Sequence, residues 1–122
     1  MLASAWDPET FDLSKDGRIA DVSDEETAEL SAVDLQLGAV IGRVDVTSEP
    51  AGVQVRPDGK VVYVTCKDDG VVYATATDSF SVVAQIPAGR RPRAIAFTAD
   101  SRTAFVPDEN DAAIVVIDAQ AH

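Results

Sequence analysis

Three arginines are the residues whose type and spacing best suit binding chemistry. Arg90, Arg91 and Arg93 stand together in the segment GRRPRAI. A guanidinium group presents a fork of N–H donors that matches carboxylates and phosphates, so the cluster predicts a site for a small anion or an acidic protein. Surface ion pairs are common and weak, and simple pairing with acids of adjacent loops is the alternative that the sequence favours.

Acidic side chains gather in three short segments, SDEET, CKDDG and PDENDA. Their oxygen atoms suit a hard cation such as calcium, but the residue spacing of an EF-hand loop is absent. The sequence therefore predicts a solvated acidic rim and no metal site. If a cation does bind, its candidate ligands are Asp68, Asp69, Asp108, Glu109 and Asp111.

The residues needed for nucleophilic catalysis are scarce. His122 is the only histidine and Cys66 the only cysteine, so a Ser-His-Asp or Cys-His pair is not expected. A glycine-rich phosphate loop and a His-x-x-x-His pair are also missing, and a haem would find no internal histidine. A reactive thiolate needs an electropositive site, whereas two aspartates follow Cys66 closely, so this cysteine is expected only to fill a turn position. The sequence favours a protein that is not an enzyme and has no cofactor.

Composition excludes some partners. The 122 residues carry 21 acidic and 10 basic side chains, a formal net charge of −11. This charge argues against binding to nucleic acids and to anionic membranes. Residues 1–49 alone hold 12 acidic and 3 basic residues. The opening MLASAWD lacks a basic region and a long apolar core, so no signal peptide is predicted, and no apolar run is long enough for a transmembrane helix.

A gap-free repeat of 42 residues organises the chain. Chance explains it poorly, because turn residues and apolar residues share the same step. The equivalent sets are Asp16-Gly17, Asp58-Gly59 and Asp100-Ser101; Pro8, Pro50 and Pro92; Phe11, Val53 and Ile95; and Val22, Val64 and Val106. The repeat units are approximately residues 7–48, 49–90 and 91–122 of one domain.

Each unit is predicted to contain four short antiparallel strands. In the middle unit these are about residues 52–55, 61–65, 71–75 and 81–86, separated by turn segments such as Pro57-Asp58-Gly59. Four-stranded units of this length are typical of β-propeller blades, which must stack on one another to bury their faces. The predicted fold class is all-β, an incomplete propeller of two full blades and most of a third. A small sandwich or barrel is the alternative, although it requires no exact repeat.

The segments EPAGVQVRPDGKVVYVTC, RPRAIAFTADSRTAFVP and AAIVVID resemble the repeat of the YVTN β-propeller family. The resemblance covers nearly the whole chain. It implies the propeller fold and leaves function open, since propellers of this kind resemble surface-layer proteins and proteins found beside quinone-dependent alcohol oxidation. Lactonases and nitrite reductases share the fold. The family is often exported, but the compartment of this chain is left unknown.

Two positions depart from the family pattern. Cys66 stands where asparagine is usual, and Asp21 replaces the motif tyrosine that is kept as Tyr63. A buried, unpaired carboxylate is costly, so the first blade is expected to be exposed or poorly packed at Asp21.

The loops that enter the first strand of each unit are expected on the same face as the acidic loops, nearest the propeller axis. Asp7, Glu49 and Arg91 are equivalent by the period, so charge changes from acidic to basic around this loop face. Together with Arg90 and Arg93 they form the candidate ligand site.

The leading hypothesis is a non-enzymatic propeller segment whose loop face is a platform for a protein or a small, anionic ligand. The alternatives are an accessory propeller of a quinone-dependent oxidoreductase system and a remnant of a lactonase-like hydrolase. Two uncovered blade faces also predict self-association or contact with the remaining blades of a longer propeller.

Overall fold

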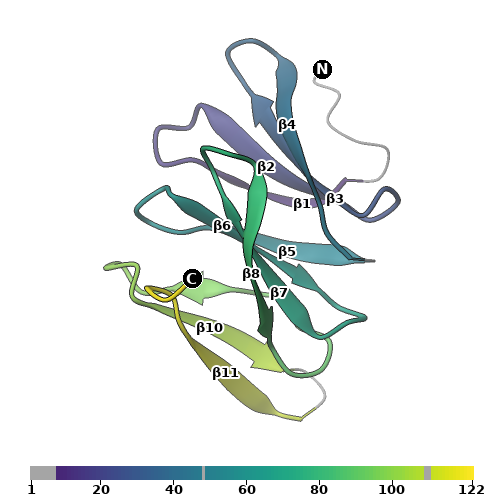
Figure 1. Cartoon of the computed structure of the whole chain (residues 1–122), viewed down its shortest axis with the longest axis vertical. Coiled ribbons are helices and arrows are strands. Elements are labelled where there is room, and N and C mark those ends of the chain that lie inside the picture. Colours follow the sequence, from purple (N-terminus) through teal and green to yellow (C-terminus); the bar gives the residue numbers. More distant parts are fainter. Residues whose placement is uncertain (1–7, 48, 109–110) are drawn as a thin grey trace.

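The computed structural model describes residues 8–47, 49–108 and 111–122, and it places three antiparallel sheets one after another along the long axis (Figure 1). Each sheet is a meander of consecutive strands. The first contains β1 (Pro8–Leu13), β2 (Ile19–Asp24), β3 (Glu29–Asp34) and β4 (Ala39–Asp45). The second contains β5 (Pro50–Val55), β6 (Val61–Cys66), β7 (Val71–Ala76) and β8 (Ser81–Pro87). The third contains β9 (Ala96–Phe97), β10 (Thr103–Asp108) and β11 (Ala113–Asp118).

The predicted all-β architecture is confirmed, including the four strands of the middle unit. The order β1-β2-β3-β4 recurs as β5-β6-β7-β8, which is the meander of a propeller blade. We call the three sheets blade 1, blade 2 and blade 3. No helix long and apolar enough to cross a bilayer occurs among the described residues.

Backbone geometry repeats with the sequence period. Gly17, Gly59 and Ser101 have positive φ angles of 73°, 75° and 65° at the turn that follows the first strand of each blade. In each of these turns the preceding aspartate accepts a hydrogen bond from the backbone N–H two residues on. The left-handed conformation favours glycine, yet Ser101 adopts it at the third of these equivalent turns. The equivalence of the three turns, predicted from the sequence, is confirmed.

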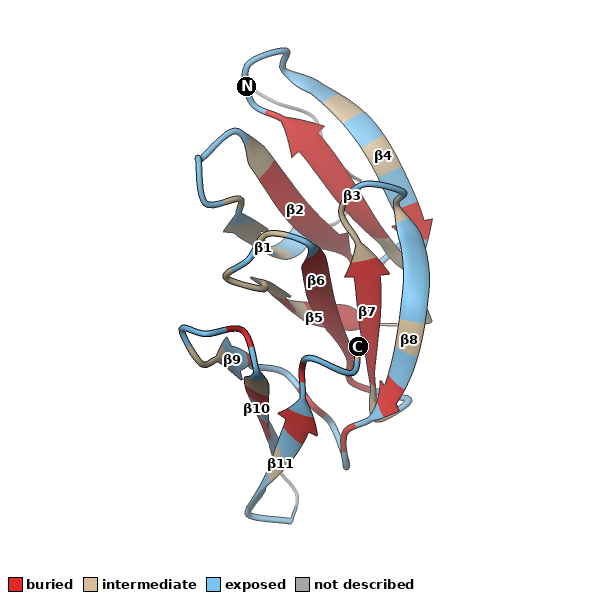
Figure 2. Ribbon diagram, turned by 60° about the vertical axis from the view of Figure 1, so that its left-hand side comes forward, coloured by how far each residue is buried: buried red, intermediate tan, exposed pale blue. Residues whose placement is uncertain are grey.

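The cores lie between blades, and the middle strands supply most of them. Figure 2 shows β2, β3, β6 and β7 as largely buried, whereas the outer strands β4 and β8 are mostly exposed. The larger cluster joins blades 2 and 3 around Tyr63, whose ring centroid lies 4.8 Å from that of Phe97. A second cluster joins blades 1 and 2 through Leu30, Val53 and Val64. Because β-branched residues dominate these strands, each blade offers a pleated apolar face to its neighbour.

One hydroxyl in each of the first two blades ties that blade to the next. The Ser23 hydroxyl donates to the carbonyl oxygen of Ala51 at 3.0 Å, and the Thr65 hydroxyl donates to that of Arg93 at 2.8 Å. The two bonds are equivalent, since all four residues are related by the 42-residue step. The stacking of blade 2 on blade 1 is therefore repeated by blade 3 on blade 2.

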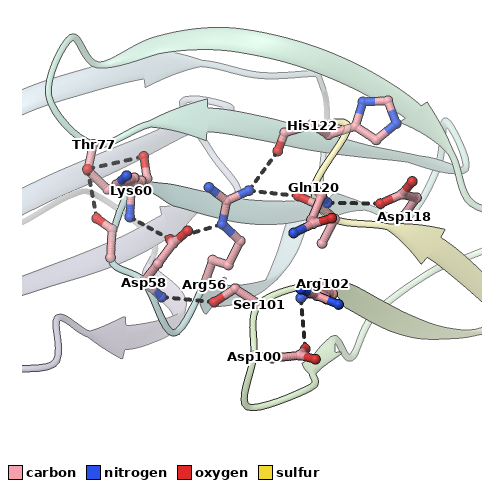
Figure 3. Close-up of polar contacts among 12 residues, drawn as sticks. Arg56, Asp58, Lys60, Thr77, Asp100, Ser101, Arg102, Asp118, Gln120 and His122 are labelled. Atoms are coloured by element: carbon pink, nitrogen blue, oxygen red, sulfur yellow. Dashed lines mark hydrogen bonds and ion pairs between the residues drawn. The ribbon is translucent and has the colours of Figure 1, made fainter.

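The interface between blades 2 and 3 is closed by Arg56 at the end opposite to the Thr65–Arg93 hydrogen bond (Figure 3). Its Nη1 atom donates to the carbonyl oxygens of Ala119 at 2.7 Å and His122 at 3.1 Å. The backbone N–H of Asp58 donates to the Ser101 hydroxyl at 3.0 Å. These contacts fill the space between the turns of blades 2 and 3 with polar groups that satisfy one another.

The outer face of blade 3 exposes apolar side chains. Phe105, Ile114 and Val116 are 37%, 63% and 64% exposed. Their equivalents in blade 2, Tyr63, Val72 and Ala74, are buried in the core shared with blade 3. The outer face of blade 3 is thus chemically the kind of surface that another blade covers.

Candidate functional site

Two of the three predicted arginines, Arg90 and Arg91, line a shallow depression where the β6–β7 loop meets the connection from β8 to β9. The depression has a volume of about 370 Å³. Its lining consists of Lys67, Asp68, Asp69, Gly70, Gly89, Arg90 and Arg91. The loop segment and the arginine segment, 20 residues apart in the sequence, therefore lie side by side on the loop face.

Long ion pairs cross this loop face. Arg91 Nη1 lies 3.7 Å from Asp68 Oδ1, and both side chains are about half exposed. Arg90 Nη1 lies 3.8 Å from Asp111 Oδ1, with the arginine side chain 70% exposed. Pairs this long and this exposed contribute little to stability, and water or another anion competes readily for the guanidinium groups.

A third, less exposed pair connects blade 2 to blade 1. Lys67 Nζ lies 3.3 Å from Glu25 Oε1, and the lysine side chain is only 9% exposed. These two residues are 42 positions apart, so an acid in one blade faces a base at the equivalent position of the next. The sequence favoured pairing of the basic residues with acids of neighbouring loops over binding of an anion, and all three ion pairs are of this kind.

Two other predicted ligand residues, Arg93 and Glu49, do not line the depression. Arg93 is exposed, and its backbone carbonyl accepts the Thr65 hydroxyl. Glu49 is half-buried, and its carbonyl oxygen accepts the Lys67 N–H at 3.3 Å. Glu49 and Arg91 share a positive φ, 57° and 54°, as the period requires. Asp7 lies outside the described residues.

Among the weak metal candidates, Asp108 has a structural role. Asp108 is buried, and its Oδ2 accepts the backbone N–H of Arg90 at 3.0 Å while Oδ1 accepts that of Asp111 at 3.3 Å. Asp68 and Asp69 line the depression, and Glu109 lies outside the described residues. In residues 8–47, 49–108 and 111–122, no three His, Cys, Asp or Glu side chains form a group that could hold a metal ion.

Cys66 is fully buried at the end of β6. Its Sγ lies 3.7 Å from the carbonyl oxygen of Thr47, toward which the S–H can donate a weak hydrogen bond. Burial raises the pKa of the thiol above its ordinary value. An inaccessible, protonated thiol is unreactive, which agrees with a packing role.

Asp21 lines a cavity between blades 1 and 2 that the sequence reasoning did not identify. Of the two outcomes expected there, exposure is wrong, because Asp21 is only 7% exposed, and incomplete packing is the one found. The cavity has a volume of about 230 Å³. Burial, and to a smaller extent the nearby charge of Asp12, raise the pKa of the Asp21 carboxyl to about 6. The signal that could have located the cavity is the loss of the motif tyrosine at this step of the repeat.

Comparisons with known proteins define the class of fold. No protein-family model matches the sequence, and no curated protein matches it either. Solved structures do match. The hydrazine synthase of Kuenenia stuttgartiensis aligns with 93% of this chain and 33% of its own, at 27% identity and a TM-score of 0.88.

Two further structures are more distant in sequence. A 6-phosphogluconolactonase-like protein of Bacteroides fragilis is 19% identical, with a TM-score of 0.83 over 91% of this chain and 34% of its own. The dihydro-haem d1 dehydrogenase NirN is 24% identical, with a TM-score of 0.76 over 91% of this chain and 24% of its own. The chain therefore spans about a third or less of the length of these structures. Their shared fold is the β-propeller, and the three sheets described here are blades of that class.

Proposed function

We propose that this chain is part of a β-propeller that binds an anionic ligand or an acidic protein segment at the depression on its loop face. The observation that carries the proposal is the meeting of Lys67, Arg90 and Arg91 around one hollow in a chain that is otherwise strongly acidic. Two aspartates, Asp68 and Asp69, share the lining, so the positive charge of the site exceeds its negative charge only slightly.

The long ion pairs support exchange with a ligand. A carboxylate that contacts Arg90 and Arg91 together replaces two pairs of 3.7 and 3.8 Å by shorter, forked hydrogen bonds. Little stability is lost when the exposed pairs open, because such pairs contribute at most about 1 kcal/mol each.

The available side chains support binding over catalysis. In the described part of the chain, the one histidine lies at residue 122 and the one cysteine is buried, so neither can activate a nucleophile at the depression. The repeat pattern resembling the YVTN family agrees with a binding propeller of that kind.

A second candidate is an accessory propeller of an oxidoreductase system. The likeness to hydrazine synthase, at 27% identity over 93% of this chain, favours it. A redox cofactor that co-purifies with the natural protein from its host, detected by its visible absorption spectrum, would support this candidate over a free-standing binding platform.

The binding proposal is tested by calorimetric titration of the chain with citrate and with a tetraglutamate peptide. We expect binding by at least one probe, weakened at 0.5 M salt because the contacts are ionic. The double variant R90Q/R91Q is expected to lower affinity at least tenfold. The exposed residues Arg43 and Arg102 lie outside the lining of the depression and provide the matched control R43Q/R102Q, which removes the same two charges. The proposal fails if neither probe binds at millimolar concentration, or if R90Q/R91Q binds as tightly as R43Q/R102Q.

A further inference from the structure

The cavity between blades 1 and 2 lies at the opposite end of the blades from the loop face, beside the turn between β1 and β2. It is lined by Ser14, Asp16, Ile19, Asp21, Ala32, Ile41, Val55, Gly59, Thr77 and Phe80. All these residues have an equivalent 42 positions further on, in blades 2 and 3. The two interfaces can therefore be compared residue by residue.

The comparison explains why the first interface is hollow. At the second interface, the Tyr63 and Phe97 rings pack together and Arg56 reaches the carbonyl oxygens of blade 3. The first interface has smaller residues at these places: Ser14 for Arg56, Asp21 for Tyr63, Val55 for Phe97 and Gly59 for Ser101. Loss of two aromatic rings and a long arginine leaves a space that the neighbouring side chains do not fill.

A buried acid faces this space. Asp21 is more than nine-tenths buried, and no hydrogen-bond donor to its carboxylate lies among the described residues. Asp16 also lines the cavity, and Asp12 lies near enough to raise the pKa of Asp21. Among the described residues, no lysine or arginine lines it. Near neutral pH the Asp21 carboxyl is therefore charged without a cation to balance it, which is costly in a buried place.

The rest of the lining suits an apolar body. Ile41 and Val55 supply aliphatic surface, and Phe80 supplies an aromatic ring, whose face attracts cations. The Phe80 ring packs directly on Gly42 of β4. A side chain at position 42 would overlap the ring, so the absence of one makes this contact possible. A cavity of 230 Å³ is larger than the roughly 150 Å³ apolar cavities that accept benzene.

We propose that this cavity binds a small organic cation, a primary ammonium group on a short aromatic or aliphatic body. The ammonium group donates hydrogen bonds to the Asp21 carboxylate. The apolar body occupies the part of the first interface that is equivalent to the space filled by the Tyr63 and Phe97 rings at the second interface. This site is separate from the loop face, so either proposal can fail alone.

The test uses the full chain and three probes of one shape: benzylamine, benzyl alcohol and phenylacetate. Calorimetry and ligand-observed NMR at pH 7.5 measure their affinities. We expect benzylamine to bind at least tenfold more tightly than benzyl alcohol, and phenylacetate not to bind, because only the amine can pair with the buried acid.

Three variants assign the binding to this cavity. D21N is expected to weaken benzylamine about tenfold to a hundredfold while benzyl alcohol is little affected. V55F restores the aromatic residue of the second interface and is expected to abolish binding of both, although Asp21 is kept. Asp45 is exposed on β4, so D45N changes the net charge equally and is expected to leave binding unchanged.

Circular dichroism and thermal unfolding establish that each variant is folded before it is titrated. The proposal is overturned if benzylamine does not bind the wild-type chain below 10 mM, or if folded D21N or V55F binds it as well as D45N does. Equal affinity for the amine and the alcohol would also overturn it, since the acid would then have no part in recognition.

Discussion

Replacing Thr65 by valine removes the hydroxyl that joins blade 2 to blade 3 and leaves side-chain shape almost unchanged. The Thr65 hydroxyl is fully buried, accepts the backbone N–H of Gly52 at 2.8 Å and donates to the Arg93 carbonyl at 2.8 Å. Each hydrogen bond contributes about 1 kcal/mol, and leaving an amide and a carbonyl unpaired adds roughly another 1 kcal/mol. The extra buried methyl group offsets somewhat less than 1 kcal/mol. Thr65→Val should therefore lower the free energy of unfolding by about 2 kcal/mol.

Urea unfolding followed by circular dichroism measures this loss. A slope of roughly 2 kcal/mol per M converts it to a midpoint shift of about 1 M. Tyr63→Phe is the matched control, two residues away on β6, because the buried Tyr63 hydroxyl has no hydrogen-bond partner among the described residues. That control should change stability by less than 0.5 kcal/mol. If Thr65→Val costs no more than Tyr63→Phe, the hydroxyl does not hold the blades together and the stacking argument is wrong.

Three further predictions concern Asp21, Cys66 and the outer face of blade 3. Because the folded pKa of Asp21 is raised from 3.8 to about 6, the folded state binds the proton more tightly, and the group costs stability as pH rises from about 4 to about 6. In urea unfolding, Asp21→Asn should gain up to about 3 kcal/mol relative to wild type at pH 7.5 compared with pH 4, and a constant difference would contradict the shifted pKa. Cys66→Ser should lower unfolding stability only modestly, and Cys66 should resist thiol-specific reagents until urea unfolds the chain; fast labelling of the native protein would contradict its burial. The chain should self-associate in light scattering at micromolar concentration, and Ile114→Lys with Val116→Lys should reduce that association, whereas a compact wild-type monomer at all concentrations would contradict it.

The fold was predictable because the information lies in short, repeated patterns. Turn residues at Asp58-Gly59 and valine-rich strands such as 61–66 determine local structure, and a gap-free period extends it to the other units. The two-residue β9 was less evident. Pro92 has no backbone N–H to give to a strand ladder, and it makes only a single bridge to Asp108. Pairing with β10 resumes at Ala96, which leaves β9 only two residues long.

Contacts between blades were harder to predict than the blades themselves. The sequence places Ser23 and Thr65 at equivalent positions, but their acceptors depend on how far one blade is rotated against the next. The same holds for Arg91, whose partner Asp68 is set by loop conformation. At Asp21 the local rule that a buried carboxylate is costly was sound, yet the outcome was a cavity within the interface and not an exposed side chain.

Both proposed sites depend on the blades being stacked with the 42-residue period, and nuclear Overhauser effects measure that stacking most directly. Contacts are expected between the ring protons of Tyr63 and Phe97, whose centroids are 4.8 Å apart. They are also expected between the β protons of Asp12 and the amide proton of Val55, whose nitrogen lies 2.8 Å from Asp12 Oδ2. The first pair joins blades 2 and 3, and the second joins blades 1 and 2. Absence of both, in a protein whose within-blade contacts are intact, would contradict the propeller arrangement.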